Sequence, residues 1–447
     1  MKERLAALAQ ALRLPDVRKR ILYVFTMFAV YVACAHIPLP GIDHKALSDY
    51  FGRGGPLGAL GDLMNAFSGG SLKRFSLLAL GIMPYINASI IFQLLVMAIP
   101  SLEELQKEGE WGRRKITKWT KYLTVALAIL QAAGMITVFR QANAFPGGPR
   151  DMMFSILMMT AGTAFLMFLG DKITENGIGQ GVSLIIFAGI MTSMPTELAQ
   201  TATIWKTGQI TIANLLLLAA IFVATIYVIV LFQQAQRKIP VQYAKRIRGN
   251  RTYGGHTSYL PLRVNQAGVI PIIFAIAVAM FPGTLAQALQ IQGVKDFFTN
   301  VLHLSQDTVG SAVASLMQWT QPGQSVAASL FYFILVIIFT YFYTAVTFNP
   351  EQIAENLQKS GGTIPGVRPG AKTRDYLDRI LYRITLAGAV FLGCIALMQY
   401  YVGSITGVTT FNLVGGTSLL IVVGVALDTM QQIEAQLLMR HYRGFLS

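Results

Sequence analysis

Long apolar runs alternate with shorter polar connections along most of the chain. Ten runs approach the length that an α-helix needs to cross about 30 Å of hydrocarbon. We predict spans at residues 21–37, 75–99, 122–139, 152–170, 180–195, 210–232, 267–285, 326–348, 384–402 and 409–427. The fifth and seventh runs are short and are interrupted by polar, Gly or Pro residues. The pattern predicts an all-α integral membrane protein with ten transmembrane helices.

The composition supports a membrane protein. Of the 447 residues, 53% are hydrophobic and 13% are charged, which is too apolar for an ordinary soluble domain. The formal net charge of +15 would suit a nucleic-acid partner only on a soluble basic face, and here the charges stand between apolar runs. Cys34 and Cys394 each lie inside an apolar run, so they imply neither a disulfide nor a cysteine-based metal site.

The placement of charge predicts the orientation. Basic residues are retained on the cytoplasmic side, and 28 of the 36 Lys and Arg residues fall at the termini and in alternate connections. Both termini are therefore expected in the cytoplasm. Residues 1–37 could also be taken for a signal peptide, because "ACA" at 33–35 resembles a cleavage site. We prefer an uncleaved first span, since the run from Ile21 to Ile37 is long for a signal core and similar spans follow it.

Residues 1–20 differ from the spans that follow. Leu5, Leu8 and Leu12 share one helical face, and the basic residues lie largely elsewhere. We therefore predict an amphipathic cytosolic helix that lies along the membrane surface.

The second spans of the two halves share a sequence pattern. "GIMPYI" at 81–86 and "GVIPII" at 268–273 both read Gly, two apolar residues, Pro, any residue and Ile. Each alone could be a tolerated proline kink. Together they suggest two related five-span halves, at residues 21–195 and 196–427, followed by a cytosolic tail at 428–447. Interrupted helices at matching positions indicate a transport path, which should pass Pro84 and Pro271.

A short apolar stretch at residues 57–68 precedes the second span. It is too brief to cross the bilayer, and Ser68, Gly69 and Gly70 end it. A half-inserted helix that returns to the same side and an amphipathic surface helix are equally compatible with this pattern.

The connection at residues 233–266 carries seven basic residues and no acidic one. Orientation alone explains a few such charges. Seven of them, interleaved with Tyr243, Tyr253 and Tyr259, exceed that requirement. We favour a docking surface for an anionic partner, such as ribosomal RNA or an acidic protein face. The candidate docking residues in this connection are Lys245, Arg246, Arg248 and Arg251.

Other classes of membrane protein fit less well. Ion-coupled carriers place ionisable groups near the middle of the membrane, whereas the central parts of these spans hold no acidic residue. A membrane hydrolase is disfavoured because His36 and His441 lie at span ends or beyond. No nucleotide-binding loop of the Gly-x-x-x-x-Gly-Lys-Ser/Thr kind is present. We expect a passive conduit, not an enzyme, with no cofactor and no metal. The neutral polar residues of the spans include Asn87, Ser89, Gln93 and Asn214.

Five long blocks, in order along nearly the whole chain, resemble the SecY/Sec61 family of protein-conducting channels in its bacterial form. The blocks are "FSGGSLKRFSLLALGIMPYINASIIFQLL", "ITENGIGQGVSLIIFAGI", "YLPLRVNQAGVIPIIFA", "NPEQIAENLQKSGGTIPGVRPGAKTRDYL" and "GGTSLLIVVGVALDT". The resemblance implies a pseudo-symmetric clamshell of two five-helix halves around an hourglass pore, in the bacterial inner membrane. Such a pore conducts unfolded secretory polypeptides, and a lateral gate releases signal sequences and transmembrane segments into lipid.

The resemblance also assigns site residues, position by position. The pore ring falls on Ile82, Ile86, Val182, Ile186, Ile273 and Ile421. The plug corresponds to the stretch at 57–68 and includes Leu60, Gly61, Leu63, Met64 and Asn65. The lateral gate, between spans two and seven, includes Pro84, Asn87, Ser89, Gln93, Gln266 and Pro271. Val182 departs from the isoleucine that is commonest in the family, so the closed ring is expected to be slightly looser there.

The connection at 349–383 resembles the cytosolic prong of the family. Pro365, Gly366 and Pro369 would fix a turn that projects Arg368 toward a partner. The alternative is an arginine that bonds the carbonyls of its own loop. The implied partners are the small membrane subunits SecE and SecG, the motor ATPase SecA, the ribosome at its tunnel exit, signal sequences and nascent polypeptides, and membrane lipid.

Overall fold

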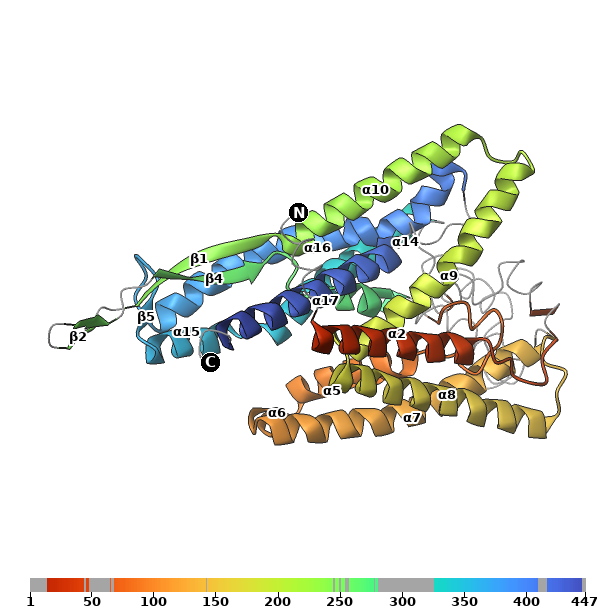
Figure 1. Ribbon diagram of the computed structural model, residues 1–447, viewed down its shortest axis with the longest axis horizontal. Coiled ribbons are helices and arrows are strands. Elements are labelled where there is room, and N and C mark those ends of the chain that lie inside the picture. The colour runs from red at the N-terminus through yellow and green to blue at the C-terminus, as the bar shows by residue number, and fades with distance from the viewer. Residues whose placement is uncertain are drawn as a thin grey trace, which may run out of the picture. The chain divides into compact units, whose positions relative to one another are not determined.

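The computed structural model describes residues 14–43, 46–47, 65, 68–141, 143–243, 246–248, 251–253, 257–276, 278–279, 325–408 and 416–443. The chain divides into two compact units. Unit 1 comprises Met1–Lys206 and Ile421–Ser447, and unit 2 comprises Thr207–Leu420. Figure 1 labels most of the helices and strands of both units.

Unit 1 is built from helices. They are α2 (Pro15–Ala35), α5 (Met83–Ala98), α6 (Pro100–Lys107), α7 (Glu110–Gln141), α8 (Pro149–Asn176) and α9 (Gly181–Lys206). Helix α17 (Gly416–Arg443) belongs to this unit from Ile421 onward. Helix α8 is the common neighbour, because it contacts α2, α5, α7 and α9.

The second predicted span does not begin as a helix. Residues 68–82 form a series of turns, and α5 starts at Met83 instead of residue 75. The backbone has positive φ at Phe75 (46°) and Gly81 (57°), where a regular helix cannot continue. Because such backbone groups cannot be left unpaired in lipid, the segment has to be enclosed by protein.

Neighbouring elements enclose this turn segment closely. The N–H of Leu39 donates to the carbonyl of Phe75 (2.9 Å), and the N–H of Leu77 donates to the carbonyl of Ile37 (2.9 Å). The Phe75 ring is fully buried and meets the Phe139 ring of α7 edge to face, with centroids 5.7 Å apart. The apolar side chains of this turn segment share one buried core with residues of α7 and α8.

Two small residues of α8 pack directly against the same segment. A Cβ atom at Gly162 would lie 2.2 Å from the carbonyl oxygen of Leu77, so only glycine allows the two backbones to approach this far. The Thr163 hydroxyl, next along α8, donates to the carbonyl of Gly81 (3.3 Å). Helix α8 therefore fixes the place where α5 starts.

Unit 2 combines helices with a small sheet. Its helices are α10 (Ile212–Gln234), α14 (Val326–Thr347), α15 (Pro350–Lys359) and α16 (Ala371–Thr406). Helix α16 contacts the other three, and Figure 1 shows α10, α14 and α16 running alongside one another. The rings of Phe232 in α10 and Phe391 in α16 stack with centroids 4.1 Å apart.

The connection at 233–266 forms a β-hairpin, which the sequence analysis did not predict. Strand β1 (Gln236–Tyr243) lies between β4 (Thr257–Arg263) and β5 (Gly362–Thr363), and both pairings are antiparallel. Strand β2 (Arg246–Arg248) pairs with β3 (Arg251–Tyr253). Residue numbers of paired residues have the same sum in β1–β4 and in β2–β3, so both ladders share one register.

The two long connections form one folded body. Ile239 and Val241 of β1 are buried in a core with Ile364, Leu377 and Leu381, which come from the second connection and the start of α16. The strands and α15 gather at one end of the long helices of unit 2 (Figure 1). Regions predicted as two separate loops are therefore one small α/β layer.

All ten predicted spans have a helical counterpart in the described part of the chain. Seven helices there are long and apolar enough to cross a membrane, namely α7, α8, α9, α10, α14, α16 and α17. Helices α5 and α6 form an eighth candidate with a bend of 102° between them. Helix α2 covers the first predicted span, and residues 270–276 and 278–279 are helical within the seventh. The fifth span is longer than predicted, because α9 continues through Pro195 to Lys206.

We predict that Gly162→Ala lowers the thermal unfolding midpoint of the protein in detergent micelles. The added Cβ meets the Leu77 carbonyl, and overpacking of this kind costs about 1–3 kcal/mol. Gly134→Ala in α7 is the matched control, because nothing lies within 4 Å of a Cβ there and alanine favours a helix by about 1 kcal/mol. Equal midpoints for Gly162→Ala and the wild type would show that α8 does not hold the turn segment this closely.

Candidate functional site

The two matched sequence patterns adopt the same backbone geometry. Gly81 and Gly268 have φ angles of 57° and 65°, a region that favours glycine. In each unit the helix begins two residues after this glycine, at Met83 and at Ile270. The glycine therefore ends the irregular segment and sets the direction in which the helix departs.

The prolines of these patterns start the helices and do not kink them. Pro84 and Pro271 each stand at the second helical position. An N–H at this position has no partner within its own helix, so proline loses no hydrogen bond there. The interruption in each span lies on the N-terminal side of the proline.

A corresponding hydrogen bond closes the first turn in both helices. The N–H of Tyr85 donates to the carbonyl of Ile82 (3.1 Å), and the N–H of Ile272 donates to the carbonyl of Val269 (3.2 Å). These four residues occupy equivalent places in the two six-residue patterns. The repeat noticed in the sequence is thus also a repeat of local structure.

The predicted ring residues are distributed over both units. Ile82, Ile86, Val182, Ile186 and Ile421 lie in unit 1, and Ile273 lies in unit 2. Ile86 and Val182 are half-buried, and the other four are buried. A Cβ at Gly170 of α8 would lie 3.5 Å from Val182, so α8 supports the start of α9 from behind. Convergence of all six residues on one constriction stays a prediction.

The predicted gate residues of α5 are half-buried, apart from buried Pro84. The Gln93 amide donates to the Ser89 hydroxyl one turn earlier (3.3 Å), and Asn87 is half-buried. In unit 2, the Oε1 atom of Gln266 is buried and has no hydrogen-bond partner among the described residues. Neutral polar groups therefore stand on or beside both interrupted spans. Contact between the two spans stays a prediction.

Of the predicted plug residues, only Asn65 lies within the described part of the chain. Its side-chain Oδ1 accepts from the N–H of Lys73 (3.0 Å). Its carbonyl accepts from the N–H of Gly70 (2.8 Å). These two bonds fold the chain back on itself directly after the predicted plug stretch. The other predicted plug residues, which lie outside the described part, are Leu60, Gly61, Leu63 and Met64.

The basic docking residues belong to the second ladder of the hairpin. Arg246 and Arg248 lie in β2, and Arg251 lies in β3 opposite Arg248. Lys245 lies outside the described residues. β2–β3 keeps the register of β1–β4, the strand pair that is anchored in the core of unit 2.

Arg368 stands exposed in the turn between β5 and α16. The N–H of Val367 donates to the carbonyl of Ile364 (3.0 Å), and Gly366 has a φ of 78°. The Thr373 hydroxyl donates to the carbonyl of Arg368 (3.0 Å). The turn is thus fixed through its backbone, while the Arg368 side chain has no hydrogen bond or ion pair with a described residue. The alternative of an arginine that bonds its own loop carbonyls finds no support here.

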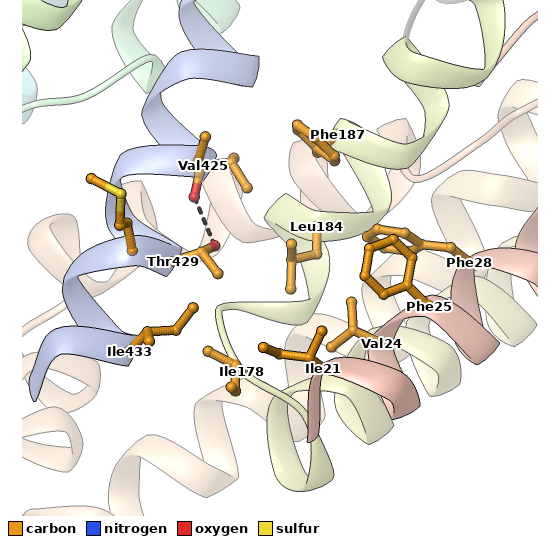
Figure 2. Close-up of a pocket in the computed structure, with 12 residues that line it drawn as sticks. Ile21, Val24, Phe25, Phe28, Ile178, Leu184, Phe187, Val425, Thr429 and Ile433 are labelled. Carbon is orange, nitrogen blue, oxygen red and sulfur yellow. Dashed lines mark hydrogen bonds between the residues drawn. The ribbon is translucent and has the colours of Figure 1, made fainter. Parts of the chain in front are cut away.

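Unit 1 also contains an apolar pocket of about 320 Å³, which the sequence analysis did not anticipate. Figure 2 shows it between α2, the start of α9 and α17. Phe25, Leu184 and Ile433 are among its lining residues. Thr429 is the one polar side chain in the lining described here, and its hydroxyl donates to the Val425 carbonyl (2.7 Å). The pocket therefore offers an apolar partner no competing polar group.

Sequence reasoning also missed a polar contact at the far end of α2. The Arg74 guanidinium contacts Nε2 of His36, although 38 residues separate them. Two polar residues at the edges of predicted spans give no signal that they meet. Their contact depends on the turn segment at 68–82, which the hydropathy pattern did not reveal.

Comparison with known proteins identifies close relatives. The SecY family model matches residues 76–430. A protein from Halalkalibacterium halodurans named "Protein translocase subunit SecY" is 44% identical, and the match covers 97% of this chain and 98% of the relative. Relatives of the same name from Streptomyces coelicolor and Bacillus subtilis are each 42% identical, over 99% and 97% of this chain and over 100% and 98% of their own.

Solved structures share the fold. One described as "The structure of a protein conducting channel" aligns with a TM-score of 0.60 at 17% identity, over 95% of this chain and 93% of its own. Canine Sec61, in a ribosome-channel complex from the endoplasmic reticulum, aligns with a TM-score of 0.58 at 18% identity over the same shares. Given these matches over most of its length, the chain belongs to the SecY family.

Proposed function

We propose that this chain is the central pore-forming subunit of a protein translocase in the bacterial inner membrane, with both termini in the cytoplasm. It conducts unfolded secretory polypeptides and releases signal sequences and transmembrane segments into lipid through a lateral gate. One observation carries this proposal: both halves interrupt their second span at the same pattern and with the same local geometry. Interrupted helices at corresponding positions line the transport path in other membrane proteins built from repeats.

The ring residues suit a gate that must pass chains of any sequence. Branched apolar side chains pack around an extended polypeptide without requiring particular partners on it. They also wet poorly and give an ion no replacement for its water, so the closed ring blocks ions. Burial of Ile82 and Ile421 in unit 1 and of Ile273 in unit 2 supports an inward-facing role.

The lateral gate is assigned to α5 and to the helix that begins at Ile270. The Gln93–Ser89 bond and the half-buried Asn87 place neutral groups along α5. Such groups can bond across a helix interface when the gate is closed and can turn to water or to a passing chain when it opens. A charged group would cost too much on the lipid side for a gate that opens and closes.

The cytosolic body of unit 2 is assigned to partner docking. Arg246, Arg248 and Arg251 lie in the strands of its hairpin, and Arg368 lies on a turn with a fixed backbone. A guanidinium suits phosphate and carboxylate alike, so these residues can serve the ribosome and the motor ATPase SecA in turn. The energy for transport comes from such partners, and the chain itself catalyses no reaction.

The apolar pocket of unit 1 is suited to bind a small membrane partner. SecE and SecG are the small subunits that the family resemblance implies. A pocket with an apolar lining, in a unit made of membrane helices, accepts side chains from a partner helix without desolvating any polar group. We assign it to one of these subunits or to a lipid chain.

We predict that Ile421→Asn admits secretory chains with defective signal sequences. Ile421 is 3% exposed, and a buried amide without partners costs about 1–3 kcal/mol, which loosens the closed state. The measurement is secretion of a signal-defective reporter in cells that hold equal amounts of each variant. Ile421→Val is the control, because it keeps a branched apolar side chain and should leave the reporter inside. Unchanged secretion with Ile421→Asn would count against the ring.

We predict that the two interrupted spans form a seam that must part during transport. Cys34 and Cys394 are first replaced by Ser, and Ser89→Cys is then paired in turn with cysteines at Phe274, Ala275 and Val278. The pair that oxidises should block import of a preprotein into vesicles, and reduction should restore it. Each single cysteine serves as the control for oxidation alone. Full import by an oxidised pair would reject the gate.

We predict that Arg368→Glu impairs import while leaving folding intact. The residue is exposed, and surface changes of this kind usually alter stability by about 0.5 kcal/mol either way. Arg368→Lys should be partly defective, because lysine keeps the charge but loses the planar set of donors. Lys372→Glu, an equal charge reversal on the exposed start of α16, is the matched control. The measurement is ATP-driven import of a preprotein into vesicles that hold equal amounts of each variant. Import by Arg368→Glu at the wild-type rate would show that Arg368 does not dock a partner.

A further inference from the structure

His36 is held in one tautomer at the end of α2. Its Nδ1 atom lies 2.8 Å from the carbonyl oxygen of Val32, which can only accept. Nδ1 therefore carries the proton, and Nε2 keeps a lone pair. The guanidinium of Arg74 contacts Nε2 and donates to it. This contact requires a neutral imidazole.

Arg74 holds the chain that directly follows the predicted plug stretch. The Nη2 atom of its guanidinium donates to the carbonyl of Gly69 (3.5 Å). Its backbone N–H donates to the carbonyl of Gly70 (3.3 Å). Gly69 is itself confined, since a Cβ there would lie 3.1 Å from both the Tyr31 hydroxyl and the Gly189 carbonyl. The guanidinium thus ties the glycine pair to the end of α2.

We propose that the His36–Arg74 contact is a proton-sensitive latch on the chain at residues 68–76. While the imidazole is neutral it accepts from Arg74, and the latch is closed. When a solvent proton binds Nε2, the acceptor lone pair is used and an imidazolium faces a guanidinium. The two cations repel, Arg74 leaves His36, and the tie to Gly69 loosens. His36 is exposed, so a proton reaches it without any prior opening.

The groups around the latch set the size of the response. Titratable and charged side chains on its own and adjoining elements include Tyr31 and Cys34 of α2, Asp43 in the following connection, Lys73 beside Arg74, Arg150 and Asp151 at the start of α8, and Glu197 of α9. Asp151 accepts from the N–H of Gly148 (3.0 Å). A carboxylate near His36 would favour the imidazolium and a cation would oppose it. Histidine is the side chain whose charge ordinarily changes between pH 5 and 8.

Hydrogen exchange read by mass spectrometry tests the latch directly. Peptides covering residues 68–76 are compared at about pH 5.5 and about pH 7.5, with labelling times scaled for the intrinsic exchange rate. The wild type should exchange faster at the lower pH, by about three- to tenfold. His36→Gln keeps an amide oxygen that accepts from Arg74 but cannot titrate, so its exchange should be the same at both values. A wild type without a pH response, or a His36→Gln variant that retains it, would overturn the proposal.

A second variant covers the case in which His36→Gln folds poorly. Arg74→Met keeps an unbranched side chain, shorter than that of arginine, and removes the donor, so residues 68–76 should exchange fast at both pH values. Slow exchange in Arg74→Met at pH 7.5 would contradict the latch. Peptides from α16, which lies in the other unit, provide the control for global opening.

The consequence for conduction rests on the plug assignment of the proposed function and is measured separately. Ion leak through the reconstituted protein should rise on acidification of the outer side in the wild type and not in His36→Gln. A pH response in exchange without a response in leak would uphold the latch and count against the plug. The two failures are therefore distinguishable.

Discussion

The need to pair every backbone N–H and carbonyl inside a membrane governs this structure. Most of the described chain meets it with helices, but residues 68–82 do not form one. Their backbone groups bond to Ile37, Leu39 and Thr163, which lie in different parts of unit 1. A stretch of irregular backbone in a span is thus possible only because the surrounding helices are arranged to receive it.

The helices enclose the irregular backbone by letting their own backbones approach it closely. At Gly162, Gly181 and Gly388 a Cβ would collide with the carbonyl of Leu77, Gly170 and Val264, respectively. Gly388 of α16 receives the irregular backbone before the second interrupted helix, as Gly162 of α8 receives it before the first. Both units therefore use a glycine on a long helix to support the chain that leads into the interruption.

The sequence predicted those features that a single run of residues determines. Ten spans follow from ten apolar runs, since any helix that crosses the bilayer needs that length. The start of α5 could not be predicted, because Leu72, Phe75 and Leu80 are as apolar as helical residues would be. The hairpin was missed for a related reason. Ile239 and Val241 are the buried apolar residues of β1, and besides Leu262 their buried core partners lie over a hundred residues away. The roles of the ring residues came from family resemblance, because the sequence alone does not distinguish an isoleucine that faces lipid from one that faces a pore.

The shared register of the two ladders limits how the hairpin can vary in length. In a β-strand successive side chains point to opposite faces, so one inserted residue turns every later side chain over. Ile239 and Val241 of β1 face the core, and β2–β3, which holds the arginines, keeps the register of β1–β4. A loop of this length would normally tolerate insertions anywhere. Here a residue gained in one strand has to be matched by a residue gained in the other, and unmatched changes are confined to the tip.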